Sequence, residues 1–173
     1  MIVRSMANRV AKGMFILAIA VAPLATRAQA NGVVLQPTAL QNLVPATVFY
    51  DGKTTTTQLR NSWGVKFTDG YYILAALVDT SGYSNAIQNE FQAYFITEVP
   101  IHINGMKLGA GVYGIGFVAG RKFVVTDVGG HKVLTVDSVT DSSLKRPRPL
   151  DVLAEPGGKF HLYEGRDYVV LNR

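Results

Sequence analysis

The sequence predicts an all-β protein, an antiparallel hairpin meander of about nine to eleven strands that either packs as a sandwich or closes as a barrel. Two observations support this fold class. The segments between turns are rich in Val, Ile, Thr, Tyr and Phe, which favour strands. Tight-turn dipeptides, which supply the positive φ values that two-residue hairpin loops require, recur at short intervals: Asp51-Gly52, Asp69-Gly70, Asn104-Gly105, Gly129-Gly130, Gly157-Gly158 and Glu164-Gly165.

The first 30 residues have the three parts of a secretory signal peptide. Basic residues come first, then a 12-residue apolar run from Met14 to Ala25, then the small-residue pattern Ala28-Gln29-Ala30. The run is too short to span a bilayer as a helix, which takes about 20 residues. We therefore expect cleavage after Ala30 and export to the periplasm or the medium. The mature chain, residues 31–173, is expected to form one domain without a transmembrane helix.

Charge and cysteine content narrow the possible partners. The chain has 17 basic and 12 acidic residues, but four of the basic residues lie in the predicted signal peptide, so 13 remain in the mature chain. A nearly neutral domain offers no broad basic field, and together with export this argues against nucleic acid as a partner. The sequence contains no cysteine, which excludes a lipid-anchored cysteine, disulfides and the common cysteine-containing zinc sites.

The first hairpin that can be tested for register is centred on Asp69-Gly70. With a two-residue loop there, the apolar residues of both strands fall on one face, as a correct register requires. That face pairs Phe67 with Tyr72, Val65 with Leu74, and Trp63 with Ala76. The one helical segment that we predict follows it, over residues 84–90, where Ser84 can cap the helix.

Three further hairpins are predicted in the middle of the chain. Around Asn104-Gly105, Ile101 and Ile103 join Met106 and Leu108 on the inner side, and His102 lies opposite Lys107 outside. A three-residue loop over residues 119–121 aligns Tyr113, Ile115 and Phe117 with Phe123 and Val125. Around Gly129-Gly130, two apolar pairs and two ion pairs form together: Phe123 with Val136, Val125 with Leu134, Lys122 with Asp137, and Asp127 with Lys132.

A basic run, Leu144-Lys145-Arg146-Pro147-Arg148-Pro149-Leu150, precedes the C-terminal strands. Alternating proline favours an extended, stiff segment, and Lys145, Arg146 and Arg148 make a local positive spot. One interpretation is a contact with an anionic partner such as a polysaccharide, a phospholipid headgroup or an acidic protein. The other is a solvated connection in which proline blocks unwanted edge pairing.

The last hairpin, around Glu164-Gly165, presents the second candidate binding surface. Its inner face gathers Phe160, Leu162, Val169 and Leu171. On the outer face, the predicted register sets His161 opposite Tyr168 and Tyr163 opposite Arg166. Aromatic rings beside Arg and His can stack on sugars or pack against a partner protein, or they can cover a second layer of the same domain.

The segment Leu108-Gly109-Ala110-Gly111-Val112-Tyr113 resembles the L-x-x-G-x-Y element of small exported bacterial β-domains of unknown function. The resemblance implies an exported β-sandwich-like domain and carries over no functional residue. The same glycines match Gly-x-Gly-x-x-Gly, but a dinucleotide site needs this pattern between a strand and a helix. Because the following residues continue as a strand, we expect Gly114 and Gly116 instead to admit a close neighbour to the backbone.

No catalytic, metal or cofactor site is predicted. His102, His131 and His161 are too widely spaced for a short ligand motif. Glu98 and His102 are four residues apart and would share a face of a regular strand, but Pro100 lies between them and a surface histidine is the better interpretation. No serine lies in a Gly-x-Ser-x-Gly elbow. Nothing in these patterns demands an enzyme, although a catalytic triad can assemble from residues in any chain order.

Three functional hypotheses remain open. The leading one is an exported, non-catalytic β-domain that acts as a binding or interaction module for a ligand or an envelope partner. The second is a small outer-membrane β-barrel, since residues 71–80 and 91–103 are each long enough for a membrane strand, which takes about 9–11 residues. The third is a hydrolase or isomerase whose site assembles from distant residues, and a histidine beside a carboxylate in a polar pocket would favour it.

Overall fold

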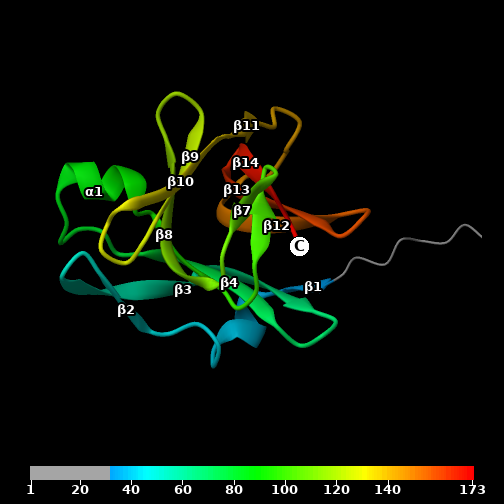
Figure 1. Ribbon diagram of the computed structural model, residues 1–173, viewed down its shortest axis with the longest axis horizontal. Coiled ribbons are helices and arrows are strands. Elements are labelled where there is room, and N and C mark those ends of the chain that lie inside the picture. The colour runs from blue at the N-terminus through cyan, green and yellow to red at the C-terminus, as the bar shows by residue number, and fades with distance from the viewer. Residues whose placement is uncertain (1–31) are drawn as a thin grey trace, which may run out of the picture.

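The strands form two antiparallel sheets that pack face to face, as the computed structural model of the chain shows for residues 32–173 (Figure 1). The predicted signal peptide, residues 1–30, lies outside the described residues. The predicted all-β class is confirmed, and the sandwich is the architecture that forms. In Figure 1 the N-terminal strands run across the lower part of the view, and the orange and red C-terminal strands lie above them.

The first sheet contains eight strands in the order β1-β3-β4-β5-β8-β9-β10, with β2 paired to β3. Its strands are β1 (Gly32–Leu35), β2 (Thr47–Tyr50), β3 (Lys53–Phe67), β4 (Tyr72–Val78), β5 (Ala93–Thr97), β8 (Gly111–Val118), β9 (Lys122–Thr126) and β10 (Lys132–Asp137).

The second sheet contains six strands in the order β12-β13-β14-β6-β7, with β11 paired to β14. Its strands are β6 (Ile101–Ile103), β7 (Met106–Leu108), β11 (Val139–Thr140), β12 (Arg148–Glu155), β13 (Lys159–Gly165) and β14 (Asp167–Asn172). Residues 32–173 thus form fourteen strands, more than predicted, because strands as short as β11 have too few residues to show alternation.

The main core lies between the two sheets, where side chains of both inner faces interdigitate. Phe67 of the first sheet meets Phe160 of the second edge to face, with ring centroids 6.3 Å apart. Twenty-two buried side chains contribute to this core, among them Trp63, Val65, Phe95, Ile101, Ile103, Ile115, Phe123, Leu162, Val169 and Leu171. Among the described residues no helix is long and apolar enough to cross a membrane.

A second apolar cluster covers the outer face of the first sheet. Phe91, which is fully buried, stacks on Tyr50 with ring centroids 3.7 Å apart, and Val48, Val78 and Tyr83 complete the cluster. Phe91 follows helix α1 (Asn85–Glu90), whose predicted N-cap Ser84 accepts a hydrogen bond from the amide of Ile87. The short helix between residues 84 and 90 is therefore confirmed.

Gly114 and Gly116 make this second cluster possible. A Cβ at Gly114 would lie 2.6 Å from the Tyr50 ring, and one at Gly116 would lie 2.6 Å from the carbonyl oxygen of Glu90. The predicted close approach to the backbone is confirmed, and the neighbours are a tyrosine ring and the end of α1. The Gly-x-Gly-x-x-Gly match ends inside strand β8, not at a helix.

The predicted register of the Asp69-Gly70 hairpin is wrong by one residue. The amide of Phe67 donates to the carbonyl of Tyr71 across a three-residue loop, so Val65 pairs with Ile73. Consequently Ile73 and Ala75 enter the main core, whereas the predicted Leu74 and Ala76 face the other way. Alternation could not distinguish the two registers because all four of these residues are buried.

The other three internal hairpins largely follow their predicted registers. Ile101 pairs with Leu108, Phe117 with Phe123, and Phe123 with Val136. Lys122 forms the predicted ion pair with Asp137. The predicted pair of Asp127 with Lys132 is wrong, because the ladder shifts between Lys132 and Leu134: Asp127 instead contacts His131, and Lys132 reaches Glu90 at 2.7 Å.

Candidate functional site

The C-terminal hairpin turns at Gly165-Arg166, so its register differs by two residues from the prediction. Tyr163 lies opposite Tyr168, and His161 lies opposite Val170. A shift of two residues keeps every side chain on its predicted face. The inner side chains Phe160, Leu162, Val169 and Leu171 are therefore buried as expected, and the outer ones are those that the sequence singled out.

His161, Tyr163 and Tyr168 meet on the outer face of the second sheet and form an aromatic cluster. The rings of His161 and Tyr168 stack with centroids 4.4 Å apart, and Tyr168 lies 5.0 Å from Tyr163. The cluster is not an open stacking platform, since Tyr163 is only 3% exposed and the His161 side chain only 13% exposed. Its polar atoms are directed into contacts within the domain.

These contacts hold the loop of residues 141–147 against the sheet. The Tyr163 hydroxyl donates to the Asp141 carboxylate at 3.2 Å, and that carboxylate also accepts from the amide and hydroxyl of Ser143. The hydrogen bonds from Ser143 lower the pKa of Asp141 below its usual value. Burial, followed by the bond to Asp141, raises the pKa of Tyr163 to about 12, so its hydroxyl stays protonated near neutral pH.

Arg166 fixes the same loop from the hairpin turn. Its guanidinium donates to the carbonyl of Ser142 at 3.2 Å and to the carbonyl of Leu144. The predicted position of Arg166 opposite Tyr163 is therefore wrong, and the residue caps loop carbonyls instead of facing the aromatic rings. Next to it, strand β11 leads into the loop, and the Thr140 hydroxyl donates to Asp167 of β14.

His161 links the cluster to a second carboxylate. Its Nε2 lies 3.1 Å from Glu155 Oε2, and its Nδ1 lies 3.5 Å from the Tyr163 hydroxyl, at the limit of a hydrogen bond. Both ring nitrogens are thus used within the domain, by a carboxylate and by a tyrosine whose raised pKa makes it a poor acid or base at neutral pH. The contacts are those of a positioning network.

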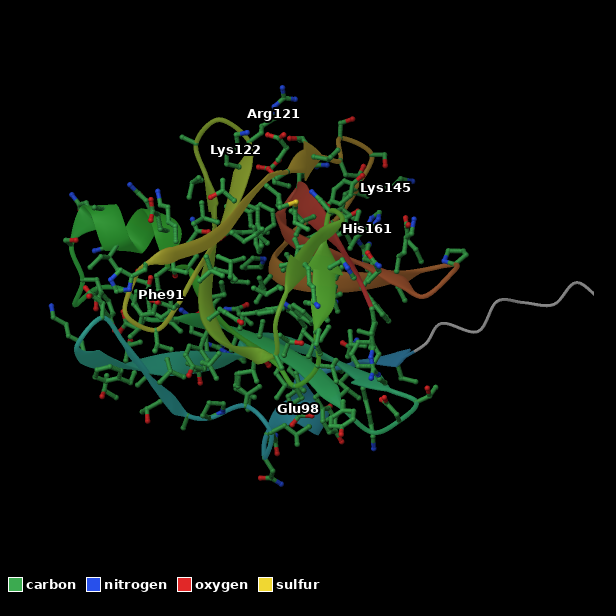
Figure 2. The ribbon with its side chains drawn as sticks, viewed as in Figure 1. Phe91, Glu98, Arg121, Lys122, Lys145 and His161 are labelled. Carbon is green, nitrogen blue, oxygen red and sulfur yellow. The ribbon has the colours of Figure 1, made fainter. Side chains whose placement is uncertain are left out.

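The predicted basic run begins in this loop and continues into strand β12. Lys145, Arg146 and Arg148 are exposed and line an open groove of about 690 Å³, which we call the basic groove. Its other lining residues are Gln36, Leu144, Pro147, Asp151, Val152 and Leu153. Leu153, 41% exposed, is the strand neighbour of His161. In Figure 2, Lys145 and His161 lie on the same side of the molecule.

The two candidate surfaces predicted from the sequence are therefore parts of one structure. The aromatic hairpin anchors the loop, and the loop presents the cations. Asp141 and Glu155, which complete the anchor, were not predicted. Their only sequence signal is a carboxylate within a short polar segment near the hairpin, and such segments are common in loops.

The remaining histidines and carboxylates have separate places. Glu98 accepts from the amide of Tyr72 at 2.8 Å, so its carboxylate serves the β4–β5 edge and not His102. His131 sits in an exposed turn beside Asp127. Within residues 32–173 no three His, Asp or Glu side chains gather closely enough to hold a metal ion.

One carboxylate of the C-terminal hairpin is held in an unfavourable environment. Glu164 lies on the inner side of the turn, half-buried, where burial and then the neighbouring Asp167 raise its pKa to about 7. Near neutral pH this group is therefore divided between its neutral and charged forms.

The L-x-x-G-x-Y segment also has a defined structure. The Tyr113 hydroxyl donates to the carbonyl of Gly109 at 3.1 Å, which folds the ring back over its own strand. A Cβ at Gly111 would lie 2.8 Å from that hydroxyl, so the small glycine leaves room for the folded-back tyrosine.

Comparison of the chain with protein-family models, with curated proteins and with solved structures found no match. The resemblance to small exported β-domains stays a prediction. Function is inferred from the basic groove and the network that positions it.

Proposed function

We propose that the chain is an exported, non-catalytic binding module that takes an extended anionic partner in the basic groove. The observation that carries this proposal is the anchoring of the loop of residues 141–147. Tyr163 and Arg166 fix residues 141–144, Lys145 and Arg146 follow directly, and Arg148 lies at the start of strand β12. A fixed loop loses less conformational entropy on binding than a mobile one does.

The charge balance of the groove favours an anion. Lys145, Arg146 and Arg148 face one acidic lining residue, Asp151, whose carboxylate lies 3.7 Å from the Arg148 guanidinium. The groove suits an extended ligand, since Pro147 stiffens the backbone of its wall. A chain bearing regularly spaced carboxylates, such as an acidic polysaccharide, matches both properties.

Binding of polygalacturonate to the mature chain tests this proposal, with neutral dextran as the reference polymer. The double variant Lys145→Gln/Arg146→Gln should bind about tenfold more weakly, because each lost cation contributes up to about 1 kcal/mol to the contact. The matched control Lys107→Gln/Arg121→Gln removes the same charge from exposed positions on β7 and the β8–β9 turn, outside the groove lining. The control should bind within about twofold of the wild type.

Calorimetry at two salt concentrations completes the experiment, because screening weakens exposed charge contacts. Equal weakening in the two double variants would show that only net charge matters and would contradict a specific groove. Binding of acidic lipid vesicles or an acidic peptide in preference to the polysaccharide would reassign the partner.

Export has its own test. When the full chain is expressed in a bacterial host, the protein recovered from the periplasm or the medium should begin at Asn31, as mass spectrometry of its N-terminus would show. Retention of residues 1–30, or recovery only in detergent, would contradict the proposal.

A further inference from the structure

A smaller and more enclosed pocket of about 150 Å³ opens beside the basic groove. The two share Gln36, Arg148 and Asp151, so the pocket continues the groove toward the first sheet. Its remaining wall is formed by Val34, Leu35, Pro37, Arg60, Asn61, Ser62, Trp63, Pro149 and Leu150.

The pocket exists because two strands interrupt their ladders beside each other. In β3 the pairing with β4 shifts between Thr57 and Ser62, and in β12 the pairing with β13 shifts between Arg148 and Asp151. The β3 irregularity is internally bonded, since Asn61 donates to the Gln58 side chain at 2.8 Å. Such bulges are common beside binding sites, where they redirect side chains.

The lining combines anion-binding groups with groups that recognise hydroxyls. Arg60 and Arg148 each offer a planar guanidinium, which suits a carboxylate. Gln36 and Asn61 supply amides that both donate and accept. Trp63 forms part of the wall at 2% exposure, and its indole N–H is buried without a hydrogen-bond partner, which is uncommon in folded proteins.

We propose that this pocket binds one acidic, ring-sized unit, a uronic acid residue at the end of a polysaccharide chain that lies in the basic groove. The assignment rests on the proposed function and names its substrate class. A cavity of about 150 Å³ holds a six-membered ring. The carboxylate of the uronate pairs with Arg60, and the ring hydroxyls meet the amides and Asp151.

The single tryptophan of the chain makes the pocket directly observable. In a titration of the ¹⁵N-labelled mature chain with free galacturonate, the one indole N–H signal should shift, and galactose, which lacks the carboxylate, should leave it unchanged. Arg60→Gln should weaken galacturonate binding at least tenfold. Arg60→Lys should have an intermediate affinity, because lysine keeps the charge but cannot form the paired hydrogen bonds of a guanidinium with a carboxylate. Arg121→Gln is the control.

The outcomes separate this inference from the proposed function. Galacturonate binding at Trp63 without polygalacturonate binding supports the pocket and contradicts the groove. Polymer binding that depends on Lys145 and Arg146, with no indole shift by galacturonate, overturns the pocket alone. An equal response to galactose also overturns it, since the site would then not recognise the carboxylate. An equal response to acetate overturns it as well, since the site would then not recognise the ring.

Discussion

The two sheets of the sandwich close their outer faces in different ways. On the first sheet, Phe91 and Tyr50 stack in a dry aromatic cluster under the end of α1. On the second sheet, Tyr163 and Arg166 hold a polar loop through three side-chain hydrogen bonds. Fully burying a large aromatic side chain stabilises a fold by several kcal/mol, whereas one hydrogen bond adds about 1 kcal/mol net. The first closure therefore contributes stability, and the second fixes the position of charges.

The largest expected effect comes from breaking the apolar closure. Phe91→Ala removes a fully buried ring, and we expect the free energy of unfolding to fall by about 3–5 kcal/mol. Phe49→Ala on neighbouring β2 is the matched control, because that ring is 55% exposed, and it should cost under about 1 kcal/mol. Urea denaturation followed by circular dichroism measures both. Similar losses in the two variants would show that the second cluster is not a core.

Replacing Glu164, which lies on the second sheet, should have an intermediate effect on the free energy of unfolding. Its pKa is raised from 4.5 to about 7 in the folded protein, so the fold favours the neutral form. The contribution of this group to stability is present below about pH 4.5 and is lost as pH rises through about 7.

Replacement by Gln removes that pH dependence. Glu164→Gln should be more stable than the wild type by about 2 kcal/mol at pH 8, a value reduced for partial solvent screening, and about equally stable at pH 4. Thermal unfolding across this pH range provides the measurement. A gain of equal size at both pH values would mean that charge at position 164 is not the cause.

The smallest expected change in the free energy of unfolding comes from a variant that should loosen only the loop of residues 141–147. Tyr163→Phe removes the hydroxyl that donates a hydrogen bond to Asp141, and the free energy of unfolding should fall by about 1 kcal/mol. Amide hydrogen exchange of residues 141–147 should nevertheless accelerate, and polygalacturonate binding should weaken, because the loop loses its anchor. Tyr168→Phe is the control, since the Tyr168 hydroxyl has no hydrogen-bond partner among the described residues. Unchanged exchange in Tyr163→Phe would assign the loop another anchor.

In hairpins with one polar and one apolar face, the sequence predicted most of the side chains that share a face, although the C-terminal register was wrong by two residues and Met106 is exposed. In the Asn104-Gly105 hairpin, His102 and Lys107 alternate with Ile101, Ile103 and Leu108, and the turn dipeptide then selects the register. Strand β4 is buried on both faces, so its register depended on the Tyr71 carbonyl and the loop length, which leave no trace in hydrophobicity.

The candidate site was predicted in pieces. His161, Tyr163 and Tyr168 were placed on one face because strand alternation is local, and the basic run was evident from composition. The aromatic cluster and the basic run are brought together by the hydrogen bond between Tyr163 and Asp141, which are 22 residues apart. Such a tertiary contact leaves no periodic pattern in the sequence. The pocket beside Trp63 was not predicted at all, since it arises from two ladder irregularities on strands distant in sequence.

The contact of Tyr113 with its own strand has an evolutionary consequence. A side chain at position 111 would displace the end of the Tyr113 ring and break the hydrogen bond of its hydroxyl to Gly109. In any lineage that descends from this chain, glycine at 111 should persist as long as tyrosine occupies 113, and relax once it is lost.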